Sequence, residues 1–114
     1  MNAVVQKDET LQYSNKPKYN VLYLKGLHIE KDERNKGWGK YFIDFLKNES
    51  FNKKCEGRII LVAYDSDKSP YLFCRKQGFE SKIDYMNKRM DKFIKNNWKI
   101  GYWYALHMYL PINN

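Results

Sequence analysis

Hydrophobic and polar residues alternate along the chain with two different periods. Early in the chain the period is two, as in a strand, with Leu22 and Leu24 on one side. The next apolar pair, Leu27 and Ile29, comes three positions later instead of two. One shift of this kind next to a glycine predicts a β-bulge at Lys25–Gly26 inside a strand that continues beyond it.

Residues 39–48 have a period near that of a helix, because their apolar residues recur at spacings of three and four. This spacing predicts an amphipathic helix that packs one face on the sheet. The predicted face consists of Trp38, Phe42, Phe45, Leu46 and Glu49.

Two further elements follow this helix. Residues 58–64 form one apolar, β-branched run, which predicts a central strand covered on both sides and adjacent to the bulged strand. Next, Ser69 and Pro70 favour the start of a short helix, and Gly78 favours its end.

The C-terminal part of the chain has clear helix and strand patterns, whereas the N-terminal part does not. A longer helix is expected over residues 84–96, and residues 102–110 alternate as a last strand. The first 18 residues are a poorly defined segment in which AVVQ and TLQY favour a short hairpin around Lys7–Glu9. The apolar side of the longer helix is expected to consist of Met86, Met90, Phe93 and Ile94.

Length and composition indicate one folded domain over residues 1–114. Apolar residues make up 43% of the chain and aromatic residues 17%, which is too much for a disordered protein. No run approaches the roughly 18 apolar residues of a membrane span, and the N-terminus lacks the apolar core of a secretory signal. We therefore expect a cytoplasmic protein without a membrane partner.

Charge and cysteine content limit the function classes. Two cysteines and two histidines, without metal-ligand spacing, favour neither a disulfide scaffold nor a metal site. The net charge of +8 predicts attraction to polyanions, among them coenzyme A, nucleic acid and the ribosome.

A basic, glycine-containing turn lies between the bulged strand and the first helix. Gly37 and Gly39 allow close backbone approach, and a helix that begins here directs N–H groups and a positive dipole end at the turn. Arg34, Lys36 and Lys40 add positive charge. The combination predicts a diphosphate site, although an ordinary turn in a lysine-rich chain has the same residues.

The order of these features resembles the GNAT superfamily of N-acetyltransferases. The resemblance covers residues 19–110 and is strongest in ERNKGWGKYF and FCRKQGFE. It implies an α/β (α+β) fold with a mixed, mainly antiparallel central sheet, a bulged and splayed strand pair and about three helices. It also implies acetyl-CoA as the acyl donor, with no metal.

The same resemblance assigns donor-binding residues. The pyrophosphate would be bound by Arg34, Asn35, Lys36, Gly37, Trp38, Gly39 and Lys40. Backbone groups of Leu27, His28 and Ile29 would pair with the pantetheine arm. Asp67 lies near a position where relatives often have an asparagine that touches the coenzyme.

Four residues are candidates for proton transfer. His28 and Glu30 lie on one side of the strand beyond the bulge, where the family often places its base, and His28 has a suitable ordinary pKa. Many members use a tyrosine four residues before the Gly-Phe pair as the acid, but here that residue is Cys74. Tyr71, one helical turn earlier, is an alternative donor. The competing role of His28 is that of a partly exposed strand histidine, and the competing role of Cys74 and Tyr71 is packing in the helix.

The resemblance implies direct acetyl transfer to a primary amine in a ternary complex. The acceptor would be a small molecule or a protein. Only about 20 residues precede the bulged strand, so the wall of the acceptor pocket would come from residues 84–96 and the last strand, or from a second subunit in a homodimer.

Two alternatives remain open. One is a GNAT-fold module that binds coenzyme A or acyl-CoA without catalysis. The other, ranked last, is a small basic RNA-binding protein whose stacking surface would be Trp98, Tyr102, Trp103 and Tyr104.

Overall fold

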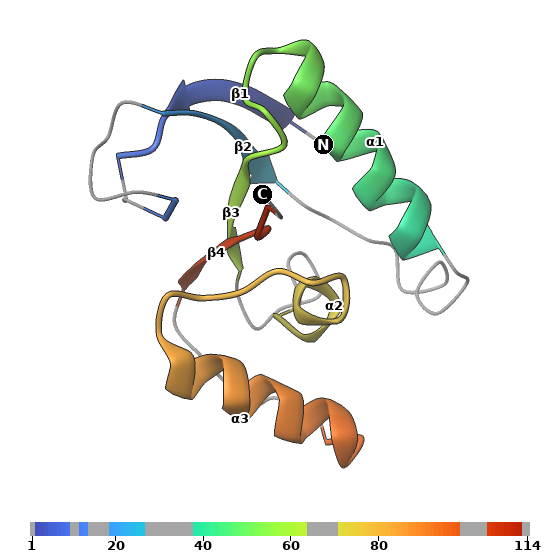
Figure 1. Ribbon diagram of the computed structural model, residues 1–114. Coiled ribbons are helices and arrows are strands. Elements are labelled where there is room, and N and C mark those ends of the chain that lie inside the picture. The colour runs from blue at the N-terminus through green and yellow to red at the C-terminus, as the bar shows by residue number, and fades with distance from the viewer. Residues whose placement is uncertain are drawn as a thin grey trace.

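The structure is a computed structural model that describes residues 2–9, 12–13, 19–26, 38–63, 71–98 and 105–112. Within these ranges the chain folds as a mixed α+β structure with one four-stranded sheet and three helices (Figure 1). This is the predicted fold class. In chain order the elements are β1 (Asn2–Lys7), β2 (Asn20–Gly26), α1 (Trp38–Asn52), β3 (Ile59–Ala63), α2 (Tyr71–Lys76), α3 (Asp84–Lys95) and β4 (Leu106–Tyr109).

The sheet has the strand order β1-β2-β3-β4. Its two central strands, β2 and β3, are parallel, and the outer strands pair with them antiparallel. The N-terminal hairpin therefore differs from the prediction: Ala3–Gln6 do form a strand, but their partner is β2 rather than Thr10–Tyr13. Pairing with β2 places β1 at an edge of the sheet, where Ala3 reaches the core.

The predicted β-bulge is present in β2. Asn2 lies opposite Gly26, whereas the next residue of β1, Ala3, lies opposite Leu24. Lys25 is thus the extra residue of the longer strand. The single shift of period in the sequence located it correctly.

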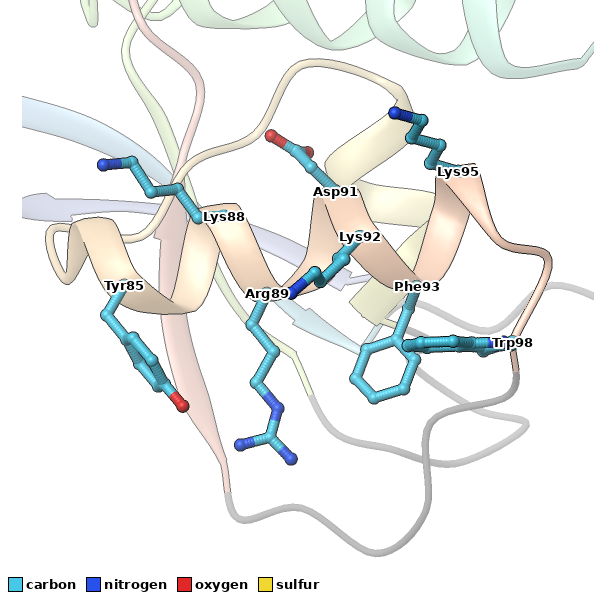
Figure 2. A pocket seen from close by; sticks show the side chains of 8 residues that line it. All are labelled: Tyr85, Lys88, Arg89, Asp91, Lys92, Phe93, Lys95 and Trp98. Carbon is cyan, nitrogen blue, oxygen red and sulfur yellow. The ribbon is translucent and has the colours of Figure 1, made fainter.

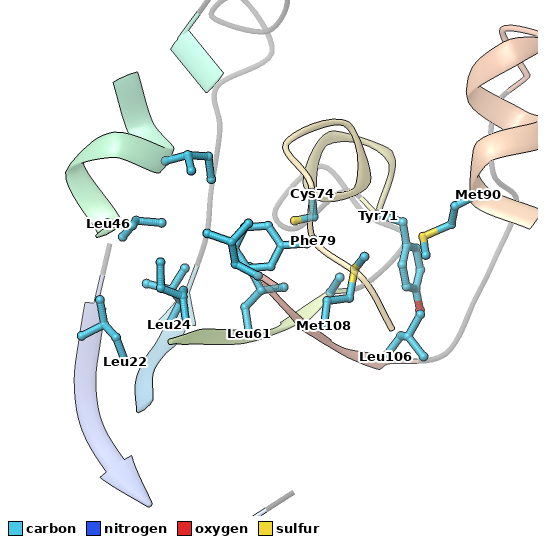
Figure 3. Packing of buried hydrophobic residues seen from close by; sticks show 14 of the residues in the cluster. Leu22, Leu24, Leu46, Leu61, Tyr71, Cys74, Phe79, Met90, Leu106 and Met108 are labelled. Atoms are coloured by element: carbon cyan, nitrogen blue, oxygen red, sulfur yellow. The ribbon is translucent and has the colours of Figure 1, made fainter. Parts of the chain in front are cut away.

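One hydrophobic core lies on the face of the sheet that the helices cover. It contains side chains from all three helices and from β2, β3 and β4 (Figures 1 and 3). α1 contacts β2 and β3, whereas α3 packs on α2. The largest fully buried members from the sheet are Leu22, Ile59, Leu61 and Met108.

The buried face of α1 differs from the predicted one. Ile43 and Leu46 enter the core, and Gly39 and Ser50 continue the same row. Phe45, which was predicted on this face, is 53% exposed. The predicted face is thus confirmed at Leu46 and at Phe42, which packs against the core, but it is rotated, because the buried row runs through Gly39 and Ser50 rather than through Phe45. The helix also extends four residues beyond the predicted end at Asn48.

The prediction that residues of β3 are covered on both sides is confirmed. Ile59 and Leu61 face the helices, and Ile60, on the opposite face, is equally inaccessible. On that face the ring of Tyr13 meets the ring of Tyr109 edge to face at 5.3 Å. The hydroxyl of Tyr13 accepts the N–H of Ile59 at 2.8 Å, which ties the segment before β2 to the sheet.

All three helices end with the same pair of main-chain hydrogen bonds, the Schellman motif. In α2 the N–H of Gly78 donates to Arg75 and the N–H of Phe79 donates to Cys74. Gly78 has a φ of 99°, so the predicted helix stop is confirmed. The equivalent positions after α1 and α3 are Lys54, with φ 64°, and Asn97, with φ 54°.

α3 begins at the predicted residue and ends one residue early. Met86 and Met90 are buried on its predicted apolar side, with Phe93 and Ile94 half-buried. Its start is fixed by Asn87, whose side chain accepts the N–H of Ser81 and donates to the Ser81 carbonyl, both at 2.7 Å. None of the described helices has the length and apolar character needed to span a bilayer.

Candidate functional site

The candidate site lies where the two parallel strands end. The carboxyl ends of parallel neighbours lie at the same edge of a sheet, and ligands of open α/β sheets often bind there. Each of the two strands is followed by a helix: β2 leads to α1, and β3 leads to α2. The fold therefore directs two connections and two helix N-termini to one edge.

The ladder between these strands stops before the strands do. β2 and β3 pair from Leu22–Ile59 to Leu24–Leu61 and no further. Yet β2 continues to Gly26 and β3 to Ala63. The last register pair lies next to Lys25, the residue that bulges.

The N-terminus of α1 approaches the end of α2. A Cβ atom on Gly39 would overlap the carboxamide of Gln77, so this close contact suits glycine. Lys40 is exposed in the first turn, which contains no acidic residue. A helix start without acidic side chains keeps its positive dipole end available to an anion.

Tyr71 and Cys74 point into the core rather than toward solvent (Figure 3). Each side chain is 1% exposed. Burial raises the pKa of the Cys74 thiol to about 12, well above its ordinary value. A group so enclosed reaches a bound substrate only if the core opens. The roles of both residues in proton transfer stay predictions, beside the packing role that the structure shows.

The other predicted site residues lie outside the described part of the chain. This applies to the two candidates for the base and to most of the predicted donor contacts. Of Trp38 only the backbone is described, at the first position of α1. The residues concerned are Leu27, His28, Ile29, Glu30, Arg34, Asn35, Lys36, Gly37 and Asp67.

Sequence reasoning missed two contacts of α2. Gln77 meets Gly39, although no pattern in the chain connects them. Arg75 forms a two-point ion pair with Asp91 of α3, with nitrogen to oxygen distances of 2.7 and 3.0 Å. Hydrogen bonding to Asp91 raises the pKa of Arg75, so the guanidinium remains charged throughout the accessible pH range. Basic residues in a last helical turn are the only sequence signal for such a pair.

A polar hollow of about 490 Å³ lies at the opposite edge, near the amino ends of the parallel strands. Tyr13, Tyr19 and Arg58 line it. The guanidinium carbon of Arg58 lies 4.8 Å from the centre of the Tyr19 ring, and its Nε donates to the carbonyl of Asn20 at 2.8 Å. These contacts close the start of β2 on the start of β3, so the hollow is separate from the candidate site.

Among the described residues, no three His, Cys, Asp or Glu side chains gather closely enough to hold a metal ion. The chemistry of the described part of the site consists of helix N-termini, main-chain groups and the exposed ammonium of Lys40. Comparisons of the chain with family models, with curated proteins and with solved structures each find no match.

Proposed function

We propose that the protein is an acetyl-CoA-dependent N-acetyltransferase of the GNAT type, which acetylates a primary amine. The observation that carries this proposal is the end of the β2–β3 ladder at the bulge of Lys25. A β-bulge leaves the main-chain groups of its extra residue outside the regular ladder, where a ligand can pair with them. The two amides of a pantetheine arm are suitable partners for these groups.

The position of α1 supports a site for the phosphates of the donor. The helix begins directly after the sequence Arg34–Gly37, and its first turn holds Lys40 and no acidic residue. Unpaired N–H groups of a first helical turn and nearby cations bind phosphate together. The net charge of +8 attracts the same anionic ligand over longer distances.

In the proposed reaction the amine nitrogen attacks the thioester carbonyl carbon. The C–N bond forms, the C–S bond breaks, and coenzyme A leaves as a thiolate. A base removes one proton from the amine, and His28 or Glu30 is the proposed base, directly or through water. The thiolate takes up a proton from water or from a nearby acid. Donor and acceptor are bound together, so no acetyl-enzyme is formed.

The acceptor in this proposal is a small-molecule or protein amine in the cytoplasm. A homodimer is compatible with the proposal if a second subunit supplies part of the acceptor wall. The other source of that wall is α3 and the segment that ends in β4.

A second candidate is a coenzyme A-binding module without catalysis. The burial of Tyr71 and Cys74 favours it, because neither candidate acid reaches solvent. Both candidates require the same donor site, so donor binding is the first test and catalysis is the second.

The first test is calorimetric titration with acetyl-CoA and with coenzyme A. Lys40→Glu reverses a charge at the start of α1, and we expect about tenfold weaker binding. Lys47→Glu makes the same change of net charge at another exposed position of the same helix, and its affinity should stay near that of the unchanged protein. Equal losses in both variants, or no binding to the folded protein, would refute the donor site.

The second test is acetyl transfer to a panel of primary amines, measured as release of free coenzyme A. The proposed enzyme transfers acetyl groups, and His28→Gln lowers kcat if His28 is the base. Donor binding without transfer to any amine would favour the non-catalytic module. Substituting Cys74 with Ala should leave kcat within about twofold of its original value if its role is packing alone.

A further inference from the structure

The outer face of α3 carries a groove that the proposed function does not use. Its volume is about 530 Å³, and α3 together with Trp98 lines it (Figure 2). In the order of the helices α2 lies between α1 and α3 (Figure 1), so this groove is separate from the start of α1. We call it the α3 groove.

Three aromatic rings form the apolar part of the α3 groove. Tyr85 is 66% exposed and Trp98 is 53% exposed, which is unusual for residues that a core could bury. Phe93 meets Trp98 edge to face, with ring centres 5.5 Å apart. Figure 2 shows Tyr85, Phe93 and Trp98 along the same side of the helix.

The ring of Trp98 is held in place by the end of α3. The N–H of Trp98 donates to the carbonyl of Phe93 at 2.9 Å, and the left-handed Asn97 turns the chain between them. This Schellman motif brings the two rings together. A ring fixed at its backbone and open on one side can stack on a ligand with little further loss of side-chain freedom.

Basic side chains lie along α3 beside these rings. In Figure 2 Arg89 extends on the side of the rings, whereas Lys88 and Lys95 point to the other side of the helix. Arg89 lies with its guanidinium carbon 5.8 Å from the centre of the Phe93 ring. Lys92 and Lys95 form no ion pair with the described residues, and Lys88 is paired only with the exposed Asp84. All four basic side chains border the groove.

Among the described residues that line the groove, the one acidic side chain is already engaged in an ion pair. Asp91 borders it, but both carboxylate oxygens are held by Arg75 of α2. In Figure 2 Asp91 points away from the ring of Trp98. The carboxylate thus contributes to the packing of α2 on α3 and leaves the groove with a cationic surface.

We propose that the α3 groove binds single-stranded nucleic acid, with bases stacked on Trp98 and Tyr85 and phosphates bound by the neighbouring cations. Interleaved aromatic rings and basic side chains are the usual means of binding such strands. From Tyr85 to Phe93 the helix rises by about 12 Å, which a few nucleotides span.

Two other polyanions fit the groove less well. A membrane surface is flat and would contact a convex, apolar patch, whereas the rings here line a concavity. An acidic peptide would pair with the cations, but its acidic side chains would not stack on the two exposed aromatic rings. The glycine-containing residues 34–39 favour coenzyme A over nucleic acid, but they belong to a different part of the chain.

The test is fluorescence anisotropy with labelled oligothymidylate and oligouridylate of about 12 nucleotides, titrated between about 50 and 200 mM salt. Trp98→Ala and Tyr85→Ala remove a ring without changing charge. We expect each to weaken binding at least about fivefold and to leave the salt dependence unchanged.

The contribution of the basic side chains to oligonucleotide binding is tested with a second set of variants. The double variant Lys92→Glu and Lys95→Glu should reduce the slope of log affinity against log salt by about 1.4, or about 0.7 for each lost phosphate contact. The matched control is Lys47→Glu on α1 with Lys54→Glu two residues after its end, which changes the net charge equally. We expect its slope to stay near that of the unchanged protein.

Several results would overturn the proposal. Equal effects of the two double variants would mean attraction by net charge alone. Unchanged oligonucleotide affinity in both ring variants, checked as folded by circular dichroism, would refute stacking. Equally tight binding of polyglutamate, or sensitivity to Trp98→Ala only with anionic phosphatidylserine vesicles, would assign the groove to another partner. Acetyl-CoA titration of the same variants should be unaffected, so failure here is distinct from failure of the proposed function.

Discussion

The two long helices of this protein serve the molecule in different ways. α1 lies on the sheet, and Ile43 and Leu46 anchor it there. The part of α1 proposed to act is its N-terminus, through main-chain groups. α3 packs on α2 and presents exposed rings and cations along its length. Anchoring in the core and presentation of functional side chains are therefore separate properties, because a helix in the outer layer keeps much of its surface exposed to solvent.

The largest expected effect concerns the anchor of α1. Leu46 is 1% exposed in the core, so Leu46→Ala should lower the free energy of unfolding by about 3 kcal/mol. Phe45→Ala, one residue away, should change it by less than about 0.5 kcal/mol because its ring is largely in solvent. Urea unfolding of both variants tests the phase of the helix. Similar losses in the two variants would contradict the anchoring described here.

A second prediction concerns the Cys74 thiol in α2, the helix on which α3 packs. Burial raises the pKa of the Cys74 thiol from an ordinary value near 9 to about 12. Above pH 9 the unfolded chain releases this proton while the folded protein retains it. The contribution of the thiol to stability is therefore complete below pH 9 and is lost as the pH rises toward 12.

The measurement is urea unfolding at pH 8, 9 and 10. The thiol should make the unfolding equilibrium constant rise by up to about tenfold per pH unit above pH 9. Cys74→Ala should reduce this slope, although burial also raises the pKa values of Cys55 and Tyr13. Identical slopes with and without the thiol would mean that Cys74 titrates normally in the folded protein.

Much of the fold could be predicted because its signals are local. The bulge at Lys25 is a break in a period of two, and the end of α2 at Gly78 is a single residue with a required backbone conformation. The phase of α1 could not be predicted in the same way. Its first nine residues are apolar or aromatic on most sides, and the packed side is marked by Gly39, which offers no hydrophobic signal.

The candidate site was less predictable for a related reason. Tyr71 and Cys74 have a spacing that fits a reactive face as well as a buried one, and only the packing of the core decides between them. The ion pair of Arg75 with Asp91 joins residues 16 positions apart on different helices. Side chains that meet only after folding leave no periodic signal in the chain.

A third prediction addresses the tether between α2 and α3. Asp91→Asn removes the charge that Arg75 binds, and we expect a loss of about 1 kcal/mol in unfolding free energy, since the pair is partly exposed. Lys88→Ala breaks the largely exposed ion pair with Asp84 and should lower the free energy of unfolding by less than about 0.5 kcal/mol. If the Arg75–Asp91 ion pair serves only to hold α3 on α2, Asp91→Asn should not weaken the binding of oligonucleotides to the α3 groove. Weaker binding would mean that the tether also shapes the α3 groove.

The smallest expected effect compares the ends of the two helices. Lys54 and Asn97 occupy the same left-handed position after α1 and α3, but asparagine tolerates this conformation better than lysine does. Lys54→Gly should therefore raise the free energy of unfolding by about 0.5 to 1 kcal/mol, and Asn97→Gly by only a few tenths, as measured by urea unfolding. Equal gains would show that local strain does not distinguish the two ends. A loss with Asn97→Gly would instead show that the position of Trp98 depends on the asparagine, which would connect the end of α3 to the ring that it presents.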